Sequence, residues 1–195
     1  MKSILSFIAY VISTFTIIIF TSSCNKDDSN RNTQNLGHIL FQYDYVNWAW
    51  GYQHAGWFID SSGNVKGYNL PHNWKYADSL GYILKDSLEL NYNNTDTLLF
   101  QVEKQELLEK AKMIEKTING KLSAKTHTAF DAGSAVLYCY YWDRKKGAYK
   151  IIFLAESGDF EQHNLDTSAI ALSNWLISIM DKTNSFWFKN LGENR

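Results

Sequence analysis

The chain has 195 residues and a nearly balanced charge, with 19 Lys and Arg against 20 Asp and Glu and a net charge of −1. Because it has no basic stripe, it lacks the electrostatic footprint of a nucleic-acid-binding protein, and we predict no nucleic-acid partner. Aromatic residues make up 15% of the sequence, and Pro71 is the only proline. Roughly 150 residues from His38 onward suffice for one domain with its own core.

The first residues have the order of an export signal. Lys2 provides a positive start, residues 4–20 carry no charge, and Thr21-Ser22-Ser23 precede Cys24. A cysteine directly after small residues resembles a bacterial lipoprotein signal. That resemblance implies cleavage before Cys24, a diacylglycerol on its thiol and an amide-linked acyl chain such as palmitate. The alternative is an uncleaved membrane anchor, although about 17 residues lie at the short limit for spanning a bilayer.

The segment after the cysteine, Asn25-Lys26-Asp27-Asp28, resembles the export signal of Bacteroidetes-type surface lipoproteins. The resemblance covers residues 1–28 only and identifies no domain family. It implies attachment to the outer membrane through the lipid on Cys24 and exposure at the cell surface; the alternative is a tether that is simply polar. We therefore predict a signal peptide at 1–23, a flexible tether at 24–37 and a single globular domain at 38–195.

The first half of the domain predicts a sheet. Residues 38–46 alternate, with Ile39, Phe41, Tyr43 and Tyr45 on one face, and 47–60 continues the sheet. A turn at 61–64 leads to a returning strand at 65–68, and 69–78 predicts a loop. The segment 79–93 is ambiguous, with short helices from about Ser79 and Asp86 as options, and 97–102 predicts a further strand.

The second half predicts two helices around a hairpin. Residues 103–119 form an amphipathic pattern ended by Gly120. Strands at 134–143 and 148–155 flank a turn containing Gly147. Asp166 or Thr167 would cap a helix at 167–180. Because hairpins dominate, we predict an α+β fold: a mainly antiparallel sheet of five to six strands, with the two main helices, about 103–119 and 167–180, on one face.

The polar residues between 127 and 163 provide weak catalytic candidates. Asp159, Glu161 and His163 are two residues apart, so an extended chain would place them on one face, where they could bind a divalent metal or orient a base. The alternative is a polar loop before a helix. His127 and Asp131 could form an acid–base dyad or belong to a turn. No phosphate loop, Cys-x-x-Cys or hydrolase motif occurs, and we predict no cofactor.

An aromatic window covers residues 43–58, where polar residues including Asp44, Asn47 and His54 lie between the rings. Aromatic faces with polar groups at their edges suit a sugar ligand. The alternative is that the rings fill the core. The ligand-binding candidates are Trp48, Trp50, Tyr52 and Trp57. Outside this window, Cys139 lies in an apolar strand pattern that predicts a buried thiol.

The leading functional hypothesis is a surface-exposed outer-membrane lipoprotein that binds a glycan or a partner protein. One alternative is a hydrolase of envelope or host polymers that uses the groups in 127–163. Another is a structural or assembly role. The triplets at 78–80, 86–88 and 96–98 resemble the short Asp-Ser/Thr-Leu acceptor pattern for O-glycosylation in the same bacterial group, but helix capping or strand entry explains them equally well.

Overall fold

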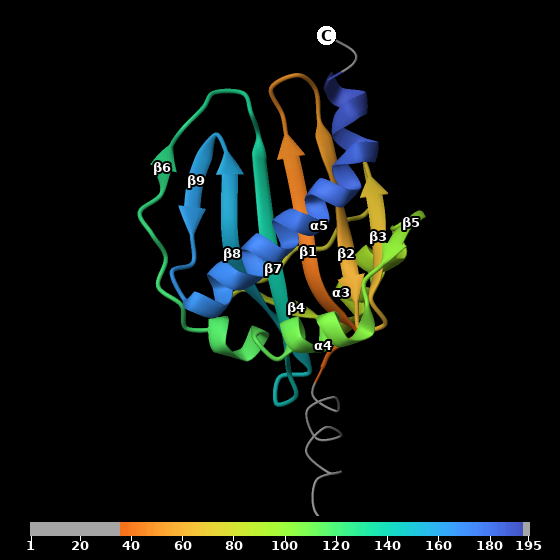
Figure 1. The fold of residues 1–195 in the computed structure, drawn as a ribbon, viewed down its shortest axis with the longest axis vertical. Helices are drawn as coiled ribbons and strands as arrows, with labels where there is room; N and C mark the ends of the chain where they lie inside the picture. Colours follow the sequence, from red (N-terminus) through yellow and green to blue (C-terminus); the bar gives the residue numbers. More distant parts are fainter. Residues whose placement is uncertain (1–35, 193–195) are drawn as a thin grey trace, which may run out of the picture. The chain divides into compact units, whose positions relative to one another are not determined.

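The structure is a computed structural model that describes residues 36–192, with side chains described as far as Thr183. The predicted signal peptide, Cys24 and most of the tether lie outside the described residues. The described chain has an α+β fold around one large antiparallel sheet of nine strands (Figure 1). None of the helices between residues 36 and 192 combines the length and apolar character that a bilayer-crossing segment needs.

One half of the sheet follows the chain as a meander. It contains β1 (Ile39–Asn47), β2 (Gln53–Asp60), β3 (Asn64–Asn69) and, at the edge, β5 (Thr97–Gln101). Each strand pairs antiparallel with its neighbour in the order β5-β3-β2-β1. This half contains the aromatic window.

The other half contains the long hairpin. It consists of β7 (Ser134–Asp143), β8 (Ala148–Gly158), β9 (Phe160–His163) and β6 (Thr126–His127), with β4 (Tyr82–Leu84) on the first residues of β8. β7 pairs with β1, with Tyr43 opposite Leu137, and thereby joins the two halves. β7 therefore lies in the middle of the sheet, where apolar residues on both of its faces can be covered.

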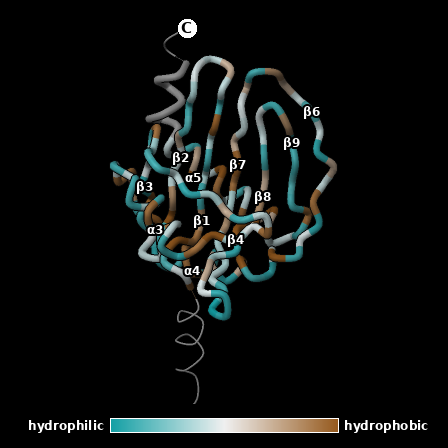
Figure 2. Tube along the Cα trace, turned by 180° about the vertical axis from the view of Figure 1, so that it is seen from behind, coloured by the Kyte–Doolittle hydropathy of each residue, from teal (hydrophilic) through white to brown (hydrophobic). Residues whose placement is uncertain are grey.

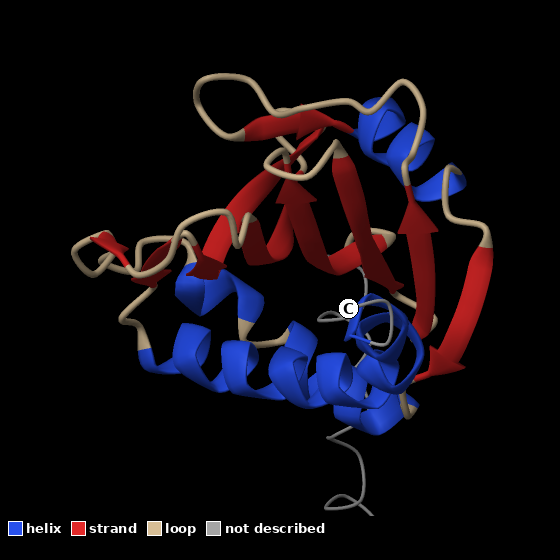
Figure 3. Cartoon of the chain, turned by 90° about the horizontal axis from the view of Figure 1, so that it is seen from above, coloured by secondary structure: helices blue, strands red, loops and turns tan. Residues whose placement is uncertain are grey.

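The helices lie on both sides of the sheet (Figure 3). α4 (Lys104–Ala111), the 3-10 helix η2 (Ile114–Thr117) and α5 (Thr167–Gly192) cover one face, and α3 (Lys85–Asn93) packs against the other. Asp166 caps α5 by accepting a hydrogen bond from the Ser168 amide at 2.8 Å.

Two apolar layers hold this arrangement. The larger one lies between the sheet and α4, η2 and α5, and its most buried members include Phe41, Trp57, Ile59, Leu154, Leu172 and Leu176. The smaller one lies under α3 and β4 and contains Ile39, Phe58, Tyr68, Ile83, Leu88, Tyr92, Tyr140 and Tyr149. Both faces of the central strands are therefore buried over part of their length.

Several element predictions need correction. The strand count was too low because β4, β6 and β9 are short and have no alternating pattern of their own. The predicted helix 103–119 is interrupted after Ala111, although Ile114 keeps the helical spacing and stays buried. In the ambiguous segment 79–93, a turn and β4 replace the optional helix near Ser79, whereas α3 confirms the option of a helix from about Asp86 and adds a third helix on the opposite face. A bulge in β1 turns Ile39 away from the face of Phe41.

Candidate functional site

The connection between β1 and β2 carries the most exposed indole rings of the described chain. Trp48 and Trp50 are 73% and 74% exposed, and Tyr52 is 42% exposed. The Trp48 and Tyr52 rings lie against each other with centroids 4.3 Å apart. These side chains are exposed because β1 ends at Asn47, so their exposure does not depend on strand alternation. We call residues 48–52 the aromatic loop.

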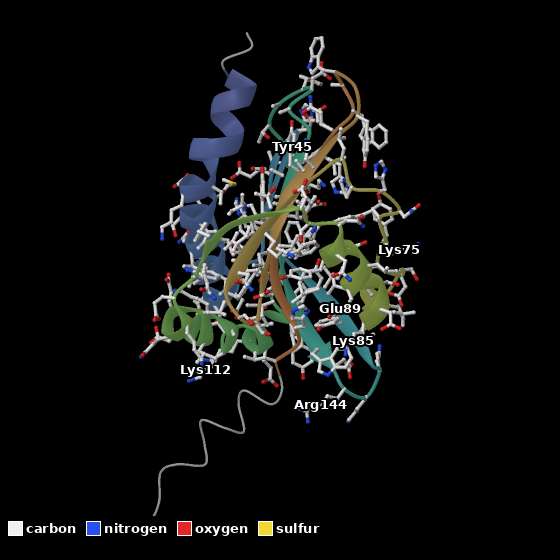
Figure 4. All side chains as sticks on the ribbon, turned by 90° about the vertical axis from the view of Figure 1, so that its right-hand side faces the viewer. Tyr45, Lys75, Lys85, Glu89, Lys112 and Arg144 are labelled. Carbon is white, nitrogen blue, oxygen red and sulfur yellow. The ribbon has the colours of Figure 1, made fainter. Side chains whose placement is uncertain are left out.

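A neighbouring turn fixes the base of the aromatic loop. Asn47 is buried; its Oδ1 accepts from the Ala49 amide at 2.8 Å and its Nδ2 donates to the Asp131 carbonyl at 3.0 Å. Tyr45 donates its hydroxyl to the Ala132 carbonyl at 3.2 Å (Figure 4). The aromatic loop is thereby tied to the segment that leads into β7, and a loop held at both ends presents its rings with little loss of freedom on binding.

Beneath the aromatic loop, a buried histidine bridges two strands. His54 is 1% exposed and its Nε2 lies 2.8 Å from Asp44 Oδ1. Its Nδ1 lies 3.1 Å from the Tyr52 hydroxyl. The carboxylate of Asp44 can only accept, so the Nε2 atom that faces it carries a proton; in the neutral form of the ring, Nδ1 then accepts from the Tyr52 hydroxyl.

The hydrogen bonds continue from Asp44 into the sheet. Tyr68 donates its hydroxyl to Asp44 Oδ1 at 2.5 Å, and Gln42 donates Nε2 to the Tyr68 oxygen at 2.8 Å. Tyr140 in turn donates to Gln42 Oε1. We call the connected set the polar chain: Tyr140, Gln42, Tyr68, Asp44, His54 and Tyr52.

Strand register brings the polar chain together. Gly56 lies opposite Asp44 on β1 and opposite Tyr68 on β3. A Cβ atom at Gly56 would lie 2.5 Å from the Tyr68 hydroxyl, so glycine leaves the space through which that hydroxyl reaches Asp44. Position 56, which lies between Asp44 and Tyr68 across the three strands, therefore requires glycine.

The loop after β3 covers this side of the sheet, which Figure 2 views directly. Trp74 packs edge-on against His54 at 4.8 Å and lies 4.8 Å from the Tyr68 ring. Tyr76 is exposed and lies close enough to Tyr52 to act on its ionisation. The polar chain is therefore shielded by Trp74, while Tyr52 and Tyr76 remain accessible.

Tyr52, His54 and Asp44 follow one another as hydroxyl, imidazole and carboxylate, which is the order of a nucleophile, its base and an orienting acid. However, burial, followed by the neighbouring Tyr76 and Asp44, raises the pKa of Tyr52. Its hydroxyl therefore stays protonated, and the arrangement favours hydrogen bonding over nucleophilic attack.

Trp57 is misplaced among the ligand-binding candidates. It is 2% exposed and packs in the larger apolar layer beside Tyr43, at a centroid distance of 5.7 Å. Trp57 lies within β2 on the sheet face that α4, η2 and α5 cover, whereas the other three candidates lie in the aromatic loop. It therefore belongs to the core.

The structure does not gather the catalytic candidates into one site. Glu161 and His163 form an exposed ion pair at 2.8 Å. His127 lies on β6 and packs against the Phe160 ring at 5.2 Å. Asp159 accepts from the Ala132 amide at 2.8 Å, which is a turn-stabilising role.

Asp131 lies in the same turn as Ala132, with a φ of 61°. Within the described residues, no group of three or more His, Cys, Asp or Glu side chains is arranged to hold a metal ion.

Of the two cysteine predictions, the structure bears on the burial of Cys139 but not on the lipidation of Cys24. Cys139 is fully buried, and burial raises the pKa of its thiol to about 12, with Thr117 acting in the opposite direction. A thiol that stays protonated is a poor nucleophile. Cys24 lies outside the described residues.

Sequence reasoning missed half of the polar chain. Asp44, His54 and Tyr52 stand in the aromatic window, but Gln42, Tyr68 and Tyr140 come from three strands and share no local motif. Only the sheet register could reveal that they meet.

Comparison with known proteins finds no matching family model, no matching curated protein and no matching solved structure.

Proposed function

We propose that this protein is a lipid-anchored protein of the outer membrane, exposed at the cell surface, which binds a glycan through the aromatic loop. The observation that carries the proposal is the exposure of Trp48 and Trp50 in the loop whose Tyr52 contacts the Asp44–His54 pair. Exposed indole rings are costly to leave in water without a partner, and such groups commonly mark interaction sites.

The chemistry of the aromatic loop favours a sugar over an apolar protein surface. Indole faces can stack on the C–H faces of a pyranose ring, while Tyr52 and the partly exposed Asp44 provide hydrogen-bonding groups for hydroxyls. The polar chain holds Tyr52 from below, so its hydroxyl is positioned before a ligand arrives. A purely apolar partner would cover the remaining acceptor sites of the Tyr52 hydroxyl and the Asp44 carboxylate without providing donors for them.

The two alternatives have less support. A hydrolase using residues 127–163 would need its acids and histidines to converge, whereas Glu161 and His163 pair with each other on β9 and Asp159 stabilises a turn. An assembly role would be favoured by one broad apolar patch, whereas the aromatic loop combines rings with polar groups.

The experiment is a glycan-binding measurement on the mature full chain and on Trp48→Ala and Trp50→Ala. We expect each variant to bind roughly tenfold more weakly or worse, with thermal stability close to that of the wild type, because exposed rings contribute little to the core. Ile170→Ala is the control, since Ile170 is an apolar side chain 44% exposed on α5, outside both the aromatic loop and the turn that holds it. Its binding should equal that of the wild type.

Tyr43→Ala provides the opposite control. Tyr43 is buried beside Trp57, and its loss should lower stability without marking a ligand contact. If both tryptophan variants bind the glycan with the affinity of the wild type, the aromatic loop is not the binding site.

A further inference from the structure

The register of the sheet places the β7–β8 hairpin beside the first described residues. β1 and β7 run antiparallel with Phe41 opposite Cys139, and β7 continues past that pair to Asp143. On the returning strand, Tyr149 accepts a hydrogen bond from the His38 amide at 2.8 Å. The hairpin tip and the start of β1 therefore share one end of the sheet, and the aromatic loop lies at the other end of β1 (Figure 1).

The hairpin tip carries three consecutive basic residues. Arg144, Lys145 and Lys146 are all exposed. Asp143 fixes the turn, because its Oδ1 accepts from the Lys145 amide at 3.0 Å and from the Lys146 amide at 3.2 Å. Their charges are thus held on a turn of defined shape.

A groove of about 640 Å³ opens beside this tip, and Tyr76, Tyr82, Leu84, Ser87 and Lys146 line it with Ala77, Asp78 and Ala148. The Lys146 ammonium lies 3.5 Å from the centre of the Tyr82 ring. Leu84 is 65% exposed although it lies in a paired strand, and Lys85 follows it. Figure 4 shows Lys85 and Arg144 toward the same end of the molecule.

Acidic residues are also present at this end, and the carboxylates of three of them are oriented by hydrogen bonds. Asp78 accepts from the Leu80 and Tyr82 amides at 2.9 and 2.8 Å, and Glu89 pairs with His38 at 2.9 Å. Asp143 is engaged as described above. Asp86, in the first turn of α3, is the remaining nearby carboxylate.

Exposed leucine, tyrosine rings and basic side chains form the combination that suits a lipid–water interface. Tyrosine lies at the level of the headgroups, leucine reaches the acyl region, and lysine keeps its ammonium among phosphates. We define the membrane-facing patch as Tyr82, Leu84, Lys85, Arg144, Lys145 and Lys146.

We propose that the membrane-facing patch docks on the anionic lipid surface to which the protein is anchored. The inference rests on the proposed lipid on Cys24. Residues 25–35, which lie outside the described chain, belong to the tether predicted from the sequence, and such a tether would have a typical reach of roughly 20 Å. The patch therefore stays close to the headgroups. β1 extends away over roughly 30 Å and directs the aromatic loop outward.

The test uses the mature, lipidated full chain in vesicles of neutral phosphatidylcholine and in vesicles that also contain phosphatidylglycerol. Hydrogen–deuterium exchange is measured over residues 82–87 and 143–148, with 48–52 as the internal reference. We expect exchange in the first two segments to slow roughly threefold or more in anionic vesicles only, and high salt should reverse the effect. The reference segment should not change.

Two triple variants locate the contact. The first removes the charges of the tip: Arg144→Gln, Lys145→Gln and Lys146→Gln. The matched control removes three exposed lysines from the helical segment on the other face of the sheet: Lys104→Gln, Lys112→Gln and Lys116→Gln. Only the tip variant should lose the protection.

Equal protection in neutral and anionic vesicles, or equal loss in both triple variants, would overturn charge-driven docking at this patch. Flotation distinguishes a failure of the docking proposal from a failure of the proposed lipid anchor on Cys24. If the chain floats with neutral vesicles but its exchange does not slow in anionic vesicles, the docking proposal alone is refuted. A chain that does not float with neutral vesicles lacks the anchor and overturns both.

Discussion

His54 is the residue on which the contacts beneath the aromatic loop converge. Its two ring nitrogens contact Asp44 and Tyr52, and Trp74 covers its ring. A buried imidazole with both nitrogens engaged is a rigid spacer between strands, because each hydrogen bond restricts its rotation. The position of Tyr52, and with it the stacked Trp48, depends on this one side chain.

Replacing that spacer should affect stability and the aromatic loop together. His54→Ala removes a buried ring and one of the two side chains that contact Asp44, leaving Tyr68 as the other, so we expect a loss of about 2–4 kcal/mol in the free energy of unfolding. Chemical denaturation measures it. His72→Ala is the control, since His72 is exposed, and should change stability by no more than about 0.5 kcal/mol. Equal stability of the two variants would show that the polar chain is not structural.

Asp60 predicts a pH dependence. Burial opposes its ionisation, but hydrogen bonds from Tyr92, Asn64 and Ser62 outweigh that and lower the pKa of Asp60. A lowered folded-state pKa stabilises the protein above the unfolded value and loses that contribution as pH falls through the folded value. The free energy of unfolding should therefore drop more steeply below about pH 4 in the wild type than in Asp60→Asn. Parallel pH profiles would contradict this assignment.

At the level of elements, the turn before β7 decides how the aromatic loop is held. Gly133 has a φ of 75° and packs directly against β1: a Cβ atom there would lie 2.6 Å from the Val46 carbonyl oxygen. The neighbouring Asp131 and Ala132 carbonyls accept from Asn47 and Tyr45. The β1–β2 connection and the turn therefore form one unit, although about 80 residues separate them.

A pair of glycine variants separates backbone strain from this contact. Gly147 also has a positive φ, of 60°, but nothing lies within 4 Å of its Cβ position. Gly147→Ala should cost about 1–2 kcal/mol, the strain of a left-handed residue. Gly133→Ala adds a backbone clash and should cost about 3–5 kcal/mol. Denaturant titration measures both, and glycan binding should fall only in Gly133→Ala; equal costs would mean that the turn relaxes freely.

For the whole molecule, the two ends of the sheet carry different surfaces. The aromatic loop lies where β1 ends, and the membrane-facing patch lies where β1 begins. If the N-terminal segment is anchored in lipid, this separation directs the binding surface away from the membrane without any additional domain.

The anchoring itself is tested at Cys24. Cys24→Ala removes the thiol that would accept the diacylglycerol, so we expect no incorporation of a fatty-acid probe and accumulation of the longer precursor. Metabolic labelling followed by gel analysis measures both. Cys139→Ala is the control, because the Cys139 thiol is buried and should not carry lipid. Undiminished label in Cys24→Ala would refute the lipoprotein assignment.

The sequence by itself determined the elements that have local signals. The β7–β8 hairpin, α5 and its Asp166 cap, and the meander of β1 to β3 follow from apolar periodicity, turn residues and capping, all of which act over a few residues. The α+β class follows from their order. The indoles at 48 and 50 were named as ligand-binding candidates because polar residues lie between the aromatic rings of this window, with burial in the core as the alternative.

The tertiary structure alone decided which side chains meet. Tyr68 reaches Asp44, and Gln42 reaches Tyr68, because of strand register, and Trp57 is buried because α4 and α5 cover its face. The catalytic candidates form no joint site because Glu161 and His163 contact each other and Asp159 accepts from the Ala132 amide. The short strands β4, β6 and β9 exist only through pairing with a longer partner. Register and layer packing join residues far apart in the chain, and no local pattern encodes such contacts.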